Sequence, residues 1–315
     1  MLTTVTLNPA IDETIIVDNY VLGGVHRIQT RRMDVGGKGI NVSKVIGLFH
    51  GATIATGYLG EKNKRFFEDF LQQHQIQHNF VLIDDVTRTN TKIIDSSRKQ
   101  TTEFNELGFY VDEKEVLELE NRLKEYEKSS HYIIFSGSMP RGITTKTFTK
   151  YLSCIQDKKK IVLDASGDML REGVKQAPFL IKPNIHELKE SFGIHAASID
   201  ELIRKTLMIR ERYQIQWILL SMGGDGCLLL SKNQVLQANA IPVEVKSTVG
   251  AGDSMLGGFI YAYDHFQDPI EALRYGVASG TMAVTMEGTE VFTQKEVMDL
   301  LPQVKIKDLS STYLS

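Results

Sequence analysis

Short apolar runs that end in small or polar residues recur along the chain. The clearest are Thr4–Leu7, Tyr132–Phe135, Ile161–Leu163, Phe179–Ile181 and Trp217–Leu220. Polar or amphipathic stretches of helical length separate these runs, and near-continuous apolar runs are typical of buried parallel strands. The pattern predicts an α/β fold with three α/β/α layers around a doubly wound, mostly parallel sheet. Ligands of such sheets bind beyond the carboxyl ends of the strands.

Two helices are predicted directly after glycine-rich loops. The first follows Gly36–Gly39, and its apolar positions recur at helical spacing at Val42, Val45, Ile46 and Phe49. The second follows Asp253, with apolar positions four residues apart at Met255, Phe259 and Tyr263. Gly257 and Gly258 inside the second helix predict close packing against a neighbour or a nucleotide, because glycine costs roughly 1 kcal/mol relative to alanine there.

Residues 12–34 and 88–104 have a different pattern. Their apolar stretches are short, partly alternating and separated by turn-like residues, at Thr14–Val17, Ile28–Met33, Thr91–Ile94 and Thr101–Phe104. Half-exposed antiparallel strands have this pattern, and they need a surface to pack against. We therefore expect a small β lid over the main domain. No repeat or proline-rich linker marks a second domain, so residues 1–315 are expected to form one domain.

Composition narrows the functional class. The net charge of −3 and the pI of about 6.3 give no basic surface for nucleic acid. Cys154 and Cys227 are the two cysteines, and they lack CxxC spacing, so reduced thiols are expected. The chain opens on a strand-like run without a basic and apolar leader, and no stretch reaches membrane-spanning length. These features predict a soluble cytoplasmic protein without nucleic-acid or membrane partners.

The segment Val249–Ser254 carries the strongest chemical signal. Gly250 and Gly252 flank a turn that places Asp253 at the start of a helix. Free backbone amides and the positive end of a helix dipole favour an anion there. From the residues alone, two interpretations of Asp253 have equal weight, a general base for phosphoryl transfer or an N-cap aspartate.

Asn184 and Glu187 have the spacing N-x-x-E. An amide and a carboxylate oxygen suit Mg²⁺, which retains several waters and takes few protein ligands. The same spacing fits a capping box at a helix start, and both interpretations remain open. The Walker A spacing G-x-x-x-x-G-K-[ST] is absent, which argues against a P-loop NTPase.

Several motifs together resemble the ribokinase-like sugar kinases of the PfkB family. Gly36–Val42 is similar to the N-terminal signature of that family, and Ser247–Ser254 is similar to its more specific C-terminal signature. Further similar segments occur in the family's order, at Thr6–Asp12, Ser136–Pro140, Lys182–Leu188 and Leu220–Gly226. The resemblance covers almost the whole chain and implies a ribokinase-like fold, with ATP and Mg²⁺ as cofactors.

The resemblance also implies roles for individual residues. Asp253 is the catalytic base, and the backbone at Gly250, Ala251 and Gly252 holds the transferred phosphoryl group. The sugar phosphate lies against Asp12, Gly37, Lys38, Asn41, Arg88 and Lys92. The nucleotide lies against Asn184, Ser221, Gly223, Gly224, Gly226 and Thr248, with Ala278–Thr289 flanking the base. Asn184 and Glu187 organise Mg²⁺ through water. Asp164 receives no role.

The opening Thr6–Asp12 segment and the Arg88/Lys92 pair resemble the bacterial ketose-phosphate kinases of the family. The version with a lysine four residues after the arginine implies phosphorylation of the 6-hydroxyl of fructose 1-phosphate to fructose 1,6-bisphosphate. Alternatives are phosphorylation of tagatose 6-phosphate, and a non-catalytic sensor of sugar phosphate or nucleotide on a kinase fold. Exposed apolar faces of the β lid predict a homodimer formed through the lid.

Overall fold

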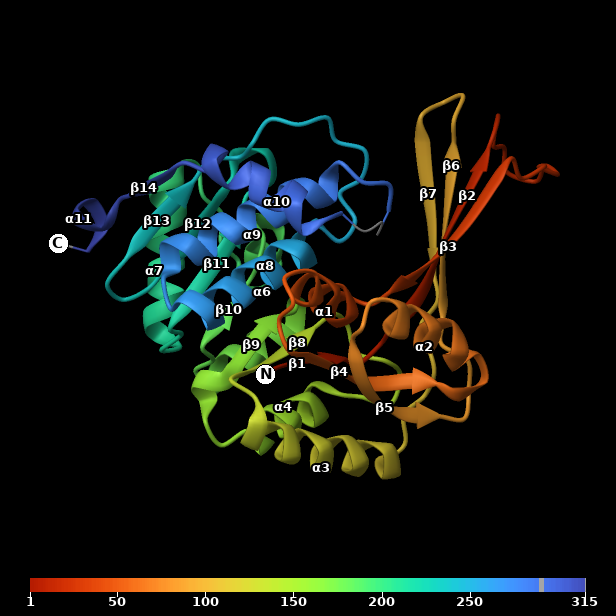
Figure 1. Ribbon diagram of the computed structural model, residues 1–315, viewed down its shortest axis with the longest axis horizontal. Helices are drawn as coiled ribbons and strands as arrows, with labels where there is room; N and C mark the ends of the chain where they lie inside the picture. The colour runs from red at the N-terminus through yellow and green to blue at the C-terminus, as the bar shows by residue number, and fades with distance from the viewer. Residues whose placement is uncertain (289–291, 315) are drawn as a thin grey trace.

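The computed structural model describes residues 1–288 and 292–314, so Thr289 of the predicted base-flanking segment and the terminal Ser315 lie outside the described residues. The strands of its large sheet are β1 (Leu2–Thr6), β4 (Thr53–Gly60), β5 (Gln77–Ile83), β8 (Tyr132–Ser136), β9 (Ile161–Asp164), β10 (Leu180–Ile181), β11 (Trp217–Ser221), β12 (Cys227–Leu230), β13 (Val235–Ala238) and β14 (Ile306–Asp308). Their order is β14-β13-β12-β11-β10-β9-β8-β1-β4-β5 (Figure 1).

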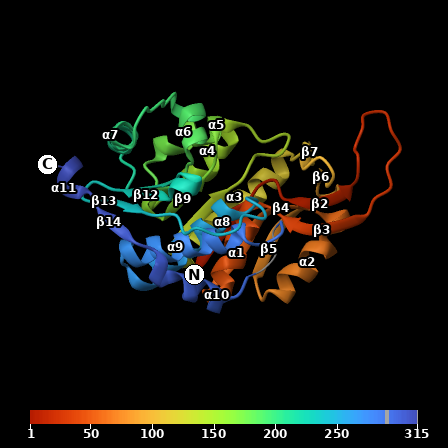
Figure 2. The same cartoon turned by 90° about the horizontal axis from the view of Figure 1, so that it is seen from above.

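Helices cover both faces of this sheet (Figure 2). One face carries α3 (Glu113–Ser129), α4 (Thr145–Cys154), α5 (Gly167–Gly173), α6 (Ile185–Phe192) and α7 (Ile199–Arg212); the other carries α1 (Lys38–Leu48), α8 (Ala251–Phe266), α9 (Pro269–Val284) and α10 (Gln294–Leu300). Successive residues of a strand point to opposite faces, so Ile133 packs in one core and Ile134 in the other. The predicted three-layer α/β/α architecture is confirmed.

The predicted parallel strands are all present. Neighbouring strands from β11 through β5 in the sheet order run parallel. The antiparallel edge of β12, β13 and β14 was not predicted. Two further α-helices are α2 (Lys64–Gln73), which packs beside β5, and α11 (Ser310–Tyr313), which lies near the C-terminus. Within the described residues, no helix has the length and apolar character needed to cross a membrane.

A second sheet projects from the main body beside α1 and α2 (Figure 1). It contains β2 (Ala10–Val17), β3 (Thr30–Gly36), β6 (Thr89–Asp95) and β7 (Gln100–Asn105), in the order β3-β2-β6-β7. These strands fall in the two segments predicted for the lid. The pairs β2–β3 and β6–β7 are antiparallel, as the strand pattern predicts, whereas β2 and β6 pair in parallel. A long excursion through α1, β4, α2 and β5 separates β2 from β6, and it permits this parallel pairing.

Two glycine turns start the helices that face the site. Gly37 precedes α1 with φ 128°, and Gly250 precedes α8 with φ 74°, in a region that side-chain-bearing residues rarely occupy. Inside α8, a Cβ on Gly257 would lie 2.7 Å from the Cβ of Val45 on α1, and one on Gly258 would lie 2.4 Å from Ser279 Oγ on α9. These glycines therefore serve close helix packing.

Candidate active site

Three adjoining pockets lie at the carboxyl ends of the parallel strands. The central pocket, of about 750 Å³, includes Lys38, Lys182 and Asp253. The lid pocket, of about 330 Å³, lies on the second sheet and shares Asp12, Arg88 and Asn90 with the central pocket. The apolar pocket, of about 550 Å³, shares Asn184, Ser221, Thr248 and Gly252 with it. Every residue to which the sequence assigns an individual role in the site lines one of these pockets.

Asp253 lies at the centre of this arrangement. It is the third residue of α8, and its side chain is only 6% exposed. The N-cap of α8 is Gly250, and Oδ2 of Asp253 accepts a 2.8 Å hydrogen bond from Nδ2 of Asn41 on α1. The structure therefore rejects the N-cap interpretation, because Gly250 occupies that position and Asp253 lines the central pocket.

The first turn of α8 presents main-chain donors beside this carboxylate. The amide of Ala251 makes a long 3.4 Å hydrogen bond to the Thr248 carbonyl, and within the described chain the amides of Gly252 and Asp253 have no main-chain acceptor. A helix start leaves such N–H groups unpaired, and they favour an anion. Oxygens of a phosphoryl group in the central pocket would satisfy them.

Burial and neighbouring charges shift the acidity of Asp253. Loss of solvent raises the pKa of its carboxyl to about 6, and the negative charge of Asp164 adds to the effect; Lys38, the Asn41 hydrogen bond and Lys182 partly oppose it. A carboxylate with a pKa near neutrality is ionised at pH 7 and holds a proton more readily than an exposed aspartate. Both properties suit a general base.

An ion cluster lies at the central pocket, whose lining includes its two lysines, Lys38 and Lys182. Asp164, at the end of β9, is fully buried; its Oδ1 lies 3.1 Å from Lys182 Nζ and its Oδ2 lies 3.6 Å from Lys38 Nζ. Ser136 Oγ donates a 2.8 Å hydrogen bond to the same carboxylate. Burial would raise the pKa of Asp164, but Lys182, Lys38 and the hydrogen bond from Ser136 together outweigh it and lower the pKa to about 2. Asp164 therefore stays ionised and fixes both lysines.

Lys182 brings its charge to the helix start. Its side chain is 5% exposed, and a Cβ built on Gly252 would lie 3.0 Å from its Nζ. The ammonium is thus beside the free amides of α8, on the side where the turn lacks a side chain. Positive charge and N–H donors together create a concentrated anion site.

Asn184 and Glu187 form the predicted capping box at the start of α6. Asn184 Oδ1 accepts from the Glu187 amide at 2.8 Å, and Glu187 Oε2 accepts from the Asn184 amide at 2.9 Å. The other carboxylate oxygen, Oε1, lies 4.0 Å from Lys38 Nζ. One oxygen of Glu187 therefore serves the helix and the other lies near the charged groups of the central pocket.

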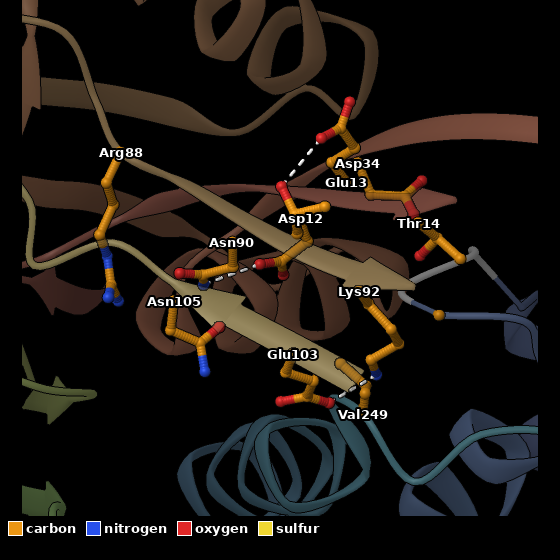
Figure 3. Close-up of a pocket in the computed structure, with 12 residues that line it drawn as sticks. Asp12, Glu13, Thr14, Asp34, Arg88, Asn90, Lys92, Glu103, Asn105 and Val249 are labelled. Carbon is orange, nitrogen blue, oxygen red and sulfur yellow. Dashed lines mark hydrogen bonds and ion pairs between the residues drawn. The ribbon is translucent and has the colours of Figure 1, made fainter. Parts of the chain in front are cut away.

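The lid pocket combines carboxylates, amides and cations on the four neighbouring strands of the second sheet (Figure 3). Asp12 on β2 is opposite Asp34 on β3 and Asn90 on β6, and Asn90 Nδ2 donates to it at 3.1 Å. Burial, with the charge of Asp34, raises the pKa of Asp12 despite this hydrogen bond. Lys92 Nζ lies 3.2 Å from Glu103 on β7. The pocket therefore has acceptors for hydroxyl groups and cations for an anion.

Arg88 lies where the lid joins the main body. Its guanidinium donates to the carbonyls of Asn8, Pro9 and Glu106, at 3.2, 3.3 and 2.8 Å. These carbonyls orient the group without neutralising it. Among the described residues no carboxylate forms an ion pair with Arg88, so its charge is available to the pocket.

Comparison with known proteins defines the family. The pfkB family carbohydrate kinase model matches residues 5–296. The chain is 32% identical to 1-phosphofructokinase of Bacillus subtilis, over 98% of this chain and 100% of that protein, and 33% identical to that of Borreliella burgdorferi, over 98% and 99%. A crystal structure of Escherichia coli phosphofructokinase-2 is similar with a TM-score of 0.89 and 26% identity, over 96% of this chain and 98% of that one. The chain belongs to the pfkB family of carbohydrate kinases.

Family membership makes the chain a phosphotransferase with an alcohol acceptor, as predicted. The sequence interpretation of this kinase missed Asp164 and Lys182 as members of the site. The signal was present, because both residues close predicted strands, and β9 and β10 are adjacent in the sheet. An acidic and a basic residue at neighbouring strand ends meet at the same edge.

Proposed function

We propose that this kinase transfers the γ-phosphoryl group of ATP to the 6-hydroxyl of fructose 1-phosphate, giving fructose 1,6-bisphosphate and ADP. The observation that carries the proposal is the position of Asp253, which lies in the central pocket between a polar pocket with cations and an apolar pocket. The relatives at about 32–33% identity that cover nearly the whole chain carry the name 1-phosphofructokinase, and this supports the choice of sugar phosphate.

The chemistry assigned to the chain has two parts. Asp253 accepts the proton of the 6-hydroxyl as its oxygen attacks the γ-phosphorus, and Asn41 orients the carboxylate. The amides of Gly252 and Asp253, in the turn formed by Gly250 and Ala251, stabilise the charge on the transferred oxygens. Lys182 adds positive charge at the same place.

The lid pocket is proposed to hold the sugar phosphate. Asp12 accepts hydrogen bonds from sugar hydroxyls, with Gly37 and Asn41 beside it at the boundary of the central pocket. Arg88 and Lys92 bind the 1-phosphate, because a guanidinium and an ammonium match phosphate oxygens. Lys38 was expected to join them, and its contacts with Asp164 and Glu187 favour a position closer to the transferred group.

The apolar pocket is proposed to hold the nucleotide. A Cβ on Gly224 would meet no protein atom within 4 Å, and the backbone of Gly224 does not require positive φ. Neither packing nor conformation explains glycine at this position, so close approach of a ligand is the remaining reason. Gly223 has the same open surroundings, but its φ of 58° by itself favours glycine, and Gly226 is crowded by the carbonyl of Ala238. Ser221 and Thr248 supply hydroxyls near the phosphates.

Asn184 and Glu187 are proposed to hold Mg²⁺ through water. Within the described residues, no group of three or more histidine, cysteine, aspartate or glutamate side chains has the geometry of a metal site. This fits Mg²⁺, which takes few protein oxygens and is bound largely by water and phosphate. The ion would neutralise phosphate charge, and Glu187 Oε1 is the oxygen not used by the capping box.

A substrate panel tests the proposal. The purified protein is incubated with Mg·ATP and with fructose 1-phosphate, fructose 6-phosphate or tagatose 6-phosphate, and ADP release is followed. Turnover of fructose 1-phosphate is expected, and an Arg88→Met variant should raise its KM without changing the KM for ATP. Turnover of tagatose 6-phosphate alone would reject the proposed substrate, and binding of ATP without turnover of any sugar would favour a sensor.

The assembly is proposed to be a homodimer formed through the lid. Leu22 and Val25 are 91% and 99% exposed, and Ile28, Met33 and Phe104 are exposed on the same sheet or its loop. Pairing of two lids would cover these side chains. Light scattering should show a dimer, and Val25→Asp should weaken it; a monomer at working concentration would contradict the proposal.

The cellular location is proposed to be the cytoplasm. The free cysteines Cys154 and Cys227 and the phosphorylated substrates suit a cytoplasmic location.

A further inference from the structure

A further cavity lies apart from the active site, near the C-terminal ends of α5, α6 and α7. Its volume of about 630 Å³ exceeds the volume of the apolar pocket. Among the described residues, none that lines this cavity also lines the central, lid or apolar pocket. We call it the basic groove, because four cationic side chains line it: Arg171, Lys175, Lys205 and Arg212.

The basic groove has an excess of positive charge. Glu172 is the one carboxylate among its described lining residues, and its Oε1 lies 2.6 Å from Lys175 Nζ. Arg212 is exposed and forms no ion pair within the described part of the chain; its guanidinium lies over the Tyr213 ring, 5.4 Å from the centroid. At least one guanidinium of the groove is therefore available to an anion.

Apolar side chains form most of the remaining lining. The rings of Phe192 and Tyr213 have centroids 6.1 Å apart, and Met208 and Ile209 of α7 line the same groove. Ser191 of α6 also belongs to the lining; it is 4% exposed, and its Oγ is buried without a hydrogen-bond partner in the described chain. Because an unpartnered buried hydroxyl is costly, a polar group of a bound ligand would stabilise it.

We propose that the basic groove is a regulatory site for a small anion with an aromatic or aliphatic body. The anionic group, a phosphate, sulfonate or carboxylate, binds the guanidinium of Arg212, and the apolar body lies against Phe192, Tyr213 and Met208. An inorganic ion would leave the apolar lining in water, and a neutral apolar compound would leave the cations without a partner. Concave sites that combine an apolar lining with a few charged groups are typical of small-molecule binding.

Arg171 connects the basic groove to the central pocket. Its Nη1 donates a 3.2 Å hydrogen bond to the carbonyl of Glu190, and its Nη2 forms an ion pair with Asp168. Both partners line the central pocket. An anion that contacts Arg171 from the groove competes with these two partners and so changes the edge of that pocket. This step rests on the proposed function, which places the transferred phosphoryl group and Mg²⁺ there. The affinity for Mg·ATP is therefore expected to depend on occupancy of the groove.

The fluorescent probe 8-anilinonaphthalene-1-sulfonate tests binding, because it carries a sulfonate on an aromatic body. It is titrated into the protein with AMP-PNP and Mg²⁺ saturating, so that the nucleotide pocket is filled. N-phenyl-1-naphthylamine has the same rings without the sulfonate and should bind about fivefold more weakly, which is the upper end of the effect of an exposed ion pair. Equal affinities of the two probes would overturn the inference.

Variants of α7 locate the bound sulfonate probe. Arg212→Gln should weaken its binding by about fivefold, for the same reason, and Met208→Gln should weaken it because less apolar area is buried. Both side chains are exposed, so both variants should fold. Arg204→Gln is the control, because Arg204 is on the same helix, with its guanidinium over the Tyr313 ring, and does not line the groove. Unchanged affinity in Arg212→Gln, or an equal loss in Arg204→Gln, would overturn the inference.

Steady-state kinetics test regulation. With fructose 1-phosphate saturating, the sulfonate probe should change the KM for Mg·ATP by about fivefold or more, as coupled sites commonly do. The probe concentration that gives half of this change should be about fivefold higher in Arg212→Gln, in step with binding. The same concentration in both proteins would indicate direct competition in the nucleotide pocket and would overturn the inference, as would an unchanged KM with the probe bound.

A binding measurement separates this inference from the proposed function. If no sugar phosphate is turned over, the proposed function fails, and the dissociation constant of AMP-PNP is measured by calorimetry with and without the probe. A change of about fivefold or more that needs a higher probe concentration in Arg212→Gln would support the regulatory site without the proposed function. An unchanged dissociation constant would overturn it.

Discussion

Replacing Asp253 with asparagine should lower activity and change the pH dependence of stability at the same time. Asparagine keeps an oxygen that accepts the Asn41 hydrogen bond but cannot take the substrate proton. Loss of a positioned general base lowers kcat by ~10²–10⁴. ATP affinity should remain, because the amides and Lys182 that face the phosphoryl group are unchanged. Wild-type kcat should also rise with pH through about 6, where Asp253 ionises.

The stability effect follows from the raised pKa of Asp253. The carboxyl has an ordinary pKa of 3.8 when the chain is unfolded and a pKa of about 6 when it is buried. The folded state therefore binds more protons between these values, and the wild-type free energy of unfolding falls as pH rises from about 4 to about 6. The full penalty above that range is about 3 kcal/mol, at 1.36 kcal/mol for each factor of ten in the acid constant.

Comparison at two pH values isolates this term. Burying the amide of the Asp253→Asn variant costs about the same free energy of unfolding at every pH. This cost therefore cancels when the difference in free energy of unfolding between variant and wild type is compared at pH 4.5 and pH 7.5. Linkage predicts that the free energy of unfolding of the variant, relative to wild type, is about 2 kcal/mol more favourable at the higher pH. Urea unfolding measures it, with Asp69→Asn, whose side chain is 68% exposed on α2, as control. A pH-independent difference, or full activity in the Asp253 variant, would refute the reasoning.

Three further perturbations test other parts of the site. Gly224→Ala places a methyl group in the open space proposed for the nucleotide and should raise the KM for ATP by about tenfold, equivalent to ~1.4 kcal/mol. Gly47→Ala on α1 is the control and should leave the KM for ATP unchanged, because the atom nearest to its Cβ would lie at 3.7 Å. Lys182→Met should lower kcat and destabilise the fold by ~3–5 kcal/mol in urea unfolding, because Asp164 loses its nearest counter-charge. Adding Asp164→Asn to this variant should recover part of the lost stability. Additive losses of stability in the double variant would contradict the pairing. Glu187→Gln should raise the Mg²⁺ concentration needed for half-maximal rate. Its thermal stability should stay near wild type, since glutamine also accepts a hydrogen bond from the Asn184 amide. An unchanged Mg²⁺ requirement would remove Glu187 from the metal site.

Local sequence features determined the elements of this fold. The apolar runs that end at Asn8, Ser136, Asp164 and Ser221 became strands of the sheet, because a strand covered on both faces requires apolar residues at successive positions. The turn at Gly250 and the helix after it were equally visible, since positive φ and helical periodicity are local properties. The family signatures then indicated which strand ends carry chemistry.

Tertiary structure decided what those residues do. Without the family resemblance, the residues around Asp253 fitted a cap and a base equally well. The packing of α1 against α8 brings Asn41 to its carboxylate. For Asn184 and Glu187 the capping box is now established, and their metal role remains a prediction. The parallel pairing of β2 with β6 joins segments separated by a long excursion, and no local pattern records such a pairing.

Asp164 shows the same division most clearly. Along the chain it is one acidic residue after an apolar run, and its partners Ser136, Lys182 and Lys38 are distant from it in sequence. In the sheet, β9 lies between β8 and β10, which brings Ser136 and Lys182 to its carboxylate, and α1 brings Lys38. Sequence by itself determined which segments became strands and helices, because that depends on neighbouring residues. The burial, charge and acidity of the site depend on distances between segments, which only the folded chain sets.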